Sequence, residues 1–169
     1  FDIFRRKRDC EELEIMVKVM ATGTFDLLHM GHIYFLKEAK KLGDALIVVV
    51  ATDSTVRKLK HEPVNPEKTR LNLIKELKIV DEAYLGLEDD MYKIVEKINP
   101  DIIALGYDQI HDELKIKEEL KKRGLDVKVK RLSEYKEGSD LKGTRKIISK
   151  IISAYEIQKS IERIEEGEK

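Results

Sequence analysis

The chain has 169 residues, of which 41% are hydrophobic and 39% are charged, and this is typical of one globular domain with its own core. Basic and acidic residues both number 33, so the overall charge favours neither nucleic acid nor an acidic membrane as a partner. No apolar run reaches the roughly 18 residues of a membrane span, and Cys10 has no second cysteine to pair with, so we expect a cytoplasmic protein without a membrane partner.

The first segment, residues 1–15, differs in composition from the rest of the chain. It carries the basic cluster Arg5-Arg6-Lys7-Arg8, which is followed by acidic residues. Such a cluster can contact phosphate or anionic lipid, but a solvated tail is the interpretation that we favour. We therefore predict an N-terminal extension over 1–15, the main domain over 16–148, and a C-terminal helix and tail over 149–169.

From Val17 onward, short apolar runs alternate with segments of helical period. This alternation is typical of βαβ units, which build a parallel sheet with helices on both faces. The runs are rich in Val and Ile, as expected for strands that are covered on both sides. They predict strands at Val17–Ala21, Ala45–Ala51, Ala83–Leu85, Ile102–Leu105 and Val127–Arg131. The predicted fold class is therefore α/β, with a five-stranded parallel sheet.

Helices are predicted between these strands and after the last one. Apolar residues that recur three or four positions apart predict helices over 33–42, from Pro66 to about 77, over about 90–98 and over about 113–123. A longer helix is predicted from Gly143 onward, and it either supplies an interface or packs on the sheet. Its apolar residues are Ile147, Ile148, Ile151, Ile152, Tyr155 and Ile157.

The residues that indicate chemistry follow the first strand directly, in the run Thr22-Gly23-Thr24-Phe25-Asp26-Leu27-Leu28-His29-Met30-Gly31-His32. Ligands of an open parallel sheet bind beyond the carboxyl ends of its strands, where the strand order reverses. Gly23 lets the backbone turn closely around an anion, and Gly31 lets the next helix begin with exposed N–H groups. His29 and His32 are three residues apart, so their rings can converge on one side of the helix start. Two such donors suit the charge that builds on an α-phosphate under attack.

A metal pair and two ordinary polar side chains are the alternatives for these two histidines. A zinc site needs further ligands, and the remaining histidines, His61 and His111, have no comparable spacing. We therefore predict no metal ligands among the residues of this motif.

The blocks Gly23–Asp26 and His29–His32 together resemble the cytidylyltransferase family of nucleotidyltransferases, whose members carry Gly-Thr-Phe-Asp followed by His-x-Gly-His. The resemblance extends over about Val17 to Ile148. It implies a Rossmann-like sheet, a divalent cation such as Mg²⁺, and transfer of AMP or CMP from ATP or CTP to a phosphorylated acceptor with release of pyrophosphate. It also implies that the two histidines bind the nucleotide phosphates. The motif residues expected to bind the nucleotide beside them are Thr22, Gly23, Thr24, Phe25 and Gly31.

Further basic residues follow from the same resemblance. A family lysine in the loop after the second strand contacts the triphosphate and the acceptor phosphate. Arg57, Lys58 and Lys60 compete for that place, and we favour Lys58 or Lys60. The family arginine that opens the next helix matches Arg70, which is therefore expected to bind nucleotide, with a solvated helix charge as the alternative.

A block near the C-terminus departs from the related glycerol-3-phosphate cytidylyltransferases. Those enzymes have Ile-Ser-Thr-Thr-Lys-Ile, in which hydroxyl groups at a helix start hold phosphate. This chain has Lys-Gly-Thr-Arg-Lys-Ile at 142–147, so only Thr144 and Lys146 match and Arg145 offers charge in place of a hydroxyl. Thr144 and Arg145 remain candidates for nucleotide binding, but glycerol 3-phosphate becomes a less favoured acceptor.

The loop Gly106-Tyr107-Asp108-Gln109 follows the fourth strand at the same sheet edge. Asp108 and Gln109 can select a nucleobase through its exocyclic amine, while a turn with a capping aspartate is the alternative. This loop, with residues 53–56 and 88–91, resembles archaeal FAD synthases, which join AMP to FMN. FMN is therefore the favoured acceptor. A glycerol-3-phosphate or other phospho-alcohol cytidylyltransferase, and a nucleotide-binding module without turnover, are the alternatives.

Two aspartates are predicted to bind substrate. Asp26 can position a cation or orient His29, or it can hold the turn in which it lies. Asp53, at the end of the second strand, can contact the ribose or the loop lysine, or it can cap a helix. A homodimer is expected by analogy with the family.

Overall fold

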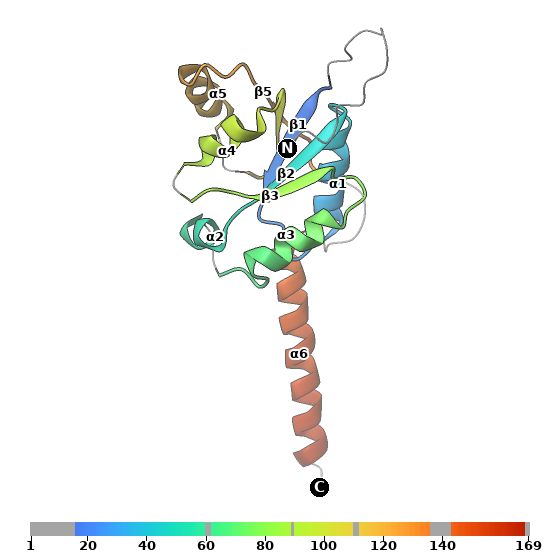
Figure 1. The fold of residues 1–169 in the computed structure, drawn as a ribbon. Coiled ribbons are helices and arrows are strands. Elements are labelled where there is room, and N and C mark those ends of the chain that lie inside the picture. The colour runs from blue at the N-terminus through green and yellow to red at the C-terminus, as the bar shows by residue number, and fades with distance from the viewer. Residues whose placement is uncertain (1–15, 60–61, 89, 110–111, 136–142, 168–169) are drawn as a thin grey trace.

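The fold is built on a parallel sheet whose strands stand in the order β3-β2-β1-β4-β5 (Figure 1). The computed structural model of the protein describes residues 16–59, 62–88, 90–109, 112–135 and 143–167. The strands are β1 (Lys18–Gly23), β2 (Ala45–Val50), β3 (Glu82–Leu85), β4 (Ile102–Leu105) and β5 (Lys128–Arg131). The α/β class and the five-stranded parallel sheet are confirmed. The predicted N-terminal extension and Lys60 lie outside the described residues.

Two hydrophobic layers, one on each face of the sheet, form the core. Successive strand residues point to opposite faces, so Val19 and Ala21 of β1 belong to one layer and Met20 belongs to the other. The first layer is covered by α1 (Met30–Lys40) and α3 (Glu67–Lys75), and the second by α4 (Met91–Ile98) and α5 (Glu113–Lys122). The prediction of helices on both faces is therefore also confirmed.

Two helix positions differ from the prediction. The first helix begins at Met30 rather than at residue 33, because the His29 backbone is extended and its carbonyl accepts the N–H groups of the first turn. For the short helix α2 (Asp53–Leu59), no range was predicted, although capping a helix was the alternative role of Asp53. The Thr52 hydroxyl caps the start of this helix by accepting the Thr55 backbone N–H at 3.2 Å. A helix this short has no apolar period to detect, and it places Lys58 on a helix instead of in a loop.

The last helix, α6 (Thr144–Gly167), extends away from the sheet and its covering helices (Figure 1). It runs without a break through residue 148, the position where the sequence predicted the end of the main domain. Within the part of the chain that the structure describes, no helix is long and apolar enough to cross a membrane.

The turn that closes α1 presses against the start of the sheet at Gly43. The backbone N–H groups of Asp44 and Ala45 both donate to the Val17 carbonyl, at 2.8 and 3.2 Å, which draws the turn onto β1. A Cβ atom at Gly43 would lie 2.6 Å from that carbonyl oxygen, closer than real contacts allow. The connection from α1 to β2 therefore requires glycine at this position, because glycine has no Cβ atom.

We expect Gly43→Ala to lower the free energy of unfolding by about 1–3 kcal/mol, because the backbone must shift to admit a methyl group. Urea denaturation monitored by circular dichroism measures the change. Gly86→Ala is the matched control, since its Cβ would meet the Val50 carbonyl at an ordinary 3.5 Å. Equal losses for the two variants would contradict the explanation.

Candidate active site

The predicted site lies at the carboxyl ends of β1 and β4, the two strands at which the strand order reverses. Gln109 joins the loops that follow them. Its side-chain Nε2 donates to the Thr22 carbonyl at 2.6 Å, and its Oε1 accepts the Gly106 backbone N–H at 3.2 Å. Arg131 supports the same loop by donating to the carbonyl oxygens of Gly106 and Gln109. Both the oxygen and the nitrogen of the Gln109 amide are therefore hydrogen-bonded to backbone groups, which favours a role in positioning the two loops over a role in selecting the base.

The turn after β1 is shaped by Phe25. This residue has a φ of 51°, in the left-handed region that a bulky side chain rarely adopts, and its ring is buried. A Cβ atom at Gly23 would lie 2.7 Å from Phe25 Cζ, so the ring lies directly over the glycine. Gly23 therefore makes room for Phe25, a role that the sequence interpretation, which assigned it to an anion, did not include.

The rings of His29 and His32 converge, as their spacing predicts. Their centroids are 3.8 Å apart with an interplanar angle of 21°, so the two imidazoles are stacked. The Phe25 ring meets His32 edge-on at 5.2 Å. His29 is the N-cap residue of α1, so both rings lie at the positive end of that helix dipole. Phe25 and the helix start together fix the pair before any ligand binds.

The electrostatic setting keeps His29 uncharged at neutral pH. Burial lowers the pKa of His29 below its usual value of 6.5, and the nearby Asp108 carboxylate opposes that shift only in part. The Nδ1 atom of His29 is buried and makes no hydrogen bond to any described residue. A neutral imidazole still donates one N–H, so the ring can serve as a hydrogen-bond donor to an anion.

Asp26 is buried behind the turn and holds the segment before α3. Its two carboxylate oxygens accept the backbone N–H groups of Val64 and Asn65, at 2.8 and 2.7 Å. The Asn65 side chain donates to the Asp26 carbonyl at 2.8 Å. This arrangement favours the turn-holding alternative for Asp26. Asn65 is a contributor that sequence reasoning missed, and its position before Pro66 at a helix start was the available signal.

Arg70 is completely buried, so the solvated helix charge considered as the alternative to nucleotide binding is wrong. Its guanidinium donates to the carbonyl oxygens of Thr24 and Asn65, at 2.6 and 3.0 Å, and to the Asp53 carboxylate at 2.6 Å. Burial by itself would raise the pKa of Asp53, but the hydrogen bonds from Arg70 and the Glu67 backbone hold that pKa below its usual range. Arg70 and Asp53 thus form an ion pair, and Arg70 links the start of α2 to the turn at Thr24 and to Asn65.

The remaining candidates differ in what the structure places around them. Arg57 is engaged by Glu62 through two hydrogen bonds of 2.7 and 2.8 Å, whereas Lys58, beside it on α2, is exposed. This favours Lys58 over Arg57 as the described candidate for the family lysine. Thr144 and Arg145 form the first turn of α6, which agrees with the predicted helix start.

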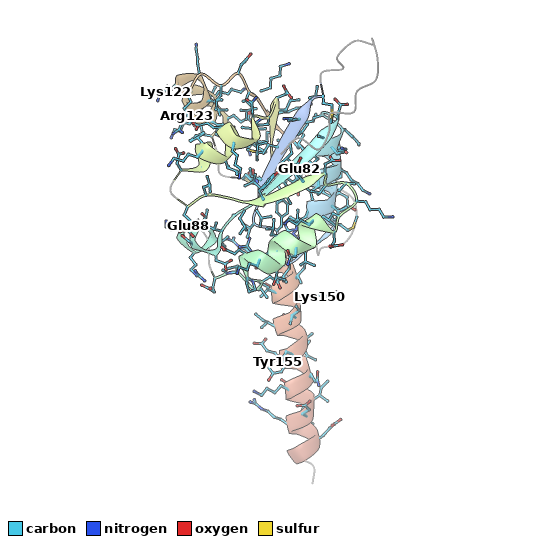
Figure 2. The ribbon with its side chains drawn as sticks, viewed as in Figure 1. Glu82, Glu88, Lys122, Arg123, Lys150 and Tyr155 are labelled. Carbon is cyan, nitrogen blue, oxygen red and sulfur yellow. The ribbon has the colours of Figure 1, made fainter. Side chains whose placement is uncertain are left out.

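A cleft of about 380 Å³ opens between α2 and the start of α3. Asp53, Arg57 and Glu88 are among the residues that line it, and Figure 2 labels Glu88 near α2. Charged side chains of both signs suit polar parts of a ligand rather than a flat apolar ring.

Comparisons with known proteins agree on one family. The model of the cytidylyltransferase-like family matches residues 20–158 of this chain. An FAD synthase of Aciduliprofundum boonei is 61% identical over 137 residues, which are 81% of this chain and 91% of that protein. An FAD synthase of Methanothermus fervidus is 59% identical over 135 residues, which are 78% of this chain and 92% of that protein.

A solved structure is similar to this chain in both sequence and fold. The crystal structure titled as a lipopolysaccharide core biosynthesis protein from Thermoplasma volcanium is 56% identical to this chain, with a TM-score of 0.70. The match covers 71% of this chain and 98% of that one.

We expect Arg70→Met to lower the free energy of unfolding by about 3 kcal/mol, because the Asp53 carboxylate and two backbone carbonyls lose their shared donor. Urea denaturation measures the change in the free energy of unfolding. Arg57→Met is the matched control: it removes an exposed ion pair and should change stability little. A loss for Arg70→Met no larger than that of the control would show that the buried network contributes nothing.

We expect His29 to titrate with a midpoint below 6.5, as measured by NMR of the imidazole ring protons. Asp108→Asn should lower that midpoint further, since it removes the carboxylate that favours the charged ring. Asp126→Asn, in the exposed segment before β5, should leave it unchanged. A midpoint above 6.5 in the unmodified protein would contradict the burial of His29.

Proposed function

This chain belongs to the cytidylyltransferase-like family, and we propose that it is an FAD synthase, an FMN adenylyltransferase that moves AMP from ATP to FMN and releases pyrophosphate. The observation that carries this function is the stacked His29 and His32 pair at the carboxyl end of β1, in a chain 61% identical to an FAD synthase over 91% of that relative's length. The intact histidine pair also argues against a nucleotide-binding module that lacks turnover.

The geometry suits a single displacement at the α-phosphate of the nucleotide. A phosphate oxygen of FMN forms a new bond to the α-phosphorus of ATP. The bond from the α-phosphorus to the oxygen that bridges to the β-phosphate breaks, and pyrophosphate leaves. Charge builds on the α-phosphate oxygens as this happens. His29, His32 and the first N–H groups of α1 donate to those oxygens, so the site stabilises the transition state without a covalent intermediate. Lys58 binds the triphosphate or the FMN phosphate from α2.

The loop after β4 is suited to hold the base. Since the Gln109 amide is engaged by Thr22 and Gly106, Asp108 is the exposed acceptor for an exocyclic amine in this loop. Adenine and cytosine both carry such an amine, so Asp108 by itself does not separate ATP from CTP. The preference for ATP that we propose rests on the similarity to FAD synthases.

A divalent cation such as Mg²⁺ would offset the charge of the triphosphate. No group of three or more His, Cys, Asp or Glu able to hold a metal occurs among the described residues. This fits a cation that arrives on the nucleotide phosphates and uses at most one or two carboxylates of the protein.

The location and the partners of the protein are also part of this proposal. The balanced charge favours neither nucleic acid nor an acidic membrane, so we propose that the enzyme acts on small molecules without either partner. We propose a cytoplasmic location because the chain has a single cysteine, and a homodimer by analogy with the family. A glycerol-3-phosphate cytidylyltransferase remains the second candidate, and the altered block at 142–147 disfavours it.

We expect His29→Ala and His32→Ala to reduce kcat by about 100-fold or more, because each removes a donor to the α-phosphate. Lys58→Ala should also lose activity, whereas Lys121→Ala on the exposed face of α5 should not. FAD and pyrophosphate formed from FMN and ATP with Mg²⁺ are measured by chromatography and a coupled assay. Formation of CDP-glycerol from CTP and glycerol 3-phosphate, with no FAD from FMN, would replace the proposal by the second candidate.

A further inference from the structure

Tyr107, in the loop after β4, is an exposed aromatic residue at the edge of the sheet where ligands bind. Its side chain is 50% exposed. Within the part of the chain that the structure describes, the other aromatic residue with this degree of exposure is Tyr155, which Figure 2 labels on α6, away from the sheet. An exposed aromatic ring beside a ligand site provides an apolar face on which a flat ring can stack. The histidine pair and the hydrogen bond proposed for Asp108 make no use of this ring.

Tyr107 lies on a turn whose two ends are fixed. The Gln109 backbone N–H donates to the Gly106 carbonyl at 3.3 Å, which closes a β-turn with Tyr107 and Asp108 at its two central positions. The Gln109 side chain ties this turn to the end of β1. Arg131 ties it to the end of β5, because it donates to the Gly106 and Gln109 carbonyl oxygens at 2.7 and 2.9 Å. The backbone beneath the tyrosine is therefore ordered before a ligand binds, which lowers the entropy cost of binding.

Two flat rings take part in the proposed reaction, the adenine of ATP and the isoalloxazine of FMN. The Asp108 carboxylate lies close enough to His29 to oppose the lowering of the pKa of that ring, so the turn lies beside the expected position of the α-phosphate. Adenine is joined to the α-phosphate through the ribose alone. The isoalloxazine is joined to its phosphate through a longer ribityl chain, and that phosphate attacks from the side opposite to the departing pyrophosphate. Adenine is therefore the ring that the two central residues of the turn can reach together.

We propose that the ring of Tyr107 stacks on the adenine of ATP and determines the preference for ATP over CTP. Adenine and cytosine both carry the exocyclic amine that Asp108 accepts, so this hydrogen bond does not separate them. Adenine has two fused rings and cytosine has one, so adenine covers more of the tyrosine face and removes more apolar surface from water. This inference rests on the proposed function, and it assigns the choice of nucleotide to a residue outside the histidine motif.

Nucleotide binding tests this proposal in the absence of an acceptor. Calorimetric titration of the full chain with ATP and with CTP, each with Mg²⁺, measures the two dissociation constants. Tyr107→Ala should raise the Kd of ATP about tenfold or more and that of CTP by less, so that the preference for ATP narrows. Tyr107→Phe keeps the ring and should retain both constants. Tyr155→Ala is the matched control, since it removes an exposed tyrosine ring away from the sheet and should leave both constants unchanged.

Steady-state kinetics separates adenine from the isoalloxazine as the ring that Tyr107 contacts. In FAD formation, Tyr107→Ala should raise the KM of ATP and leave the KM of FMN and kcat nearly unchanged, because the lost contact is to the base and not to the reacting phosphate.

Three results would overturn the proposal: equal weakening of ATP and CTP binding in Tyr107→Ala, an equally large loss in Tyr107→Phe, or a raised KM for FMN alone. An unmodified chain that binds ATP more tightly than CTP but forms no FAD would contradict the proposed acceptor instead. The titrations would still decide the role of Tyr107 in that case.

Discussion

The buried guanidinium of Arg70 is the interaction on which the arrangement of the site depends. A buried charge is unfavourable unless it is paired and hydrogen-bonded, and each of the three side-chain nitrogens of Arg70 donates a hydrogen bond to a different segment. These segments are the turn at Thr24, the residue Asn65 before α3, and the start of α2 at Asp53. Asp26 fixes the same junction from the other side by accepting two backbone N–H groups. Each segment is therefore positioned by the other two.

This junction determines the geometry of the histidines. Once Thr24 is fixed, Phe25 turns back over Gly23 in its left-handed conformation and meets His32, while His29 begins α1. Gln109 then ties the end of β1 to the loop after β4. A transfer that forms no covalent intermediate depends on donors that are already in place, because they cost little reorganisation when charge develops. The buried network thus holds the turn from which Phe25 contacts His32.

The sequence predicted the features that leave a local pattern, and it failed where contacts are distant. Runs such as Ala45–Val50 are apolar because both faces of the sheet are covered, so the strands were placed within a residue or two. Arg70 opens a helix, and its hydrogen bond to Thr24, 46 positions earlier, could not be predicted from the sequence. Gln109 contacts Thr22 across 87 positions. Neither contact, nor the seven-residue helix α2, has a periodic signal in the sequence.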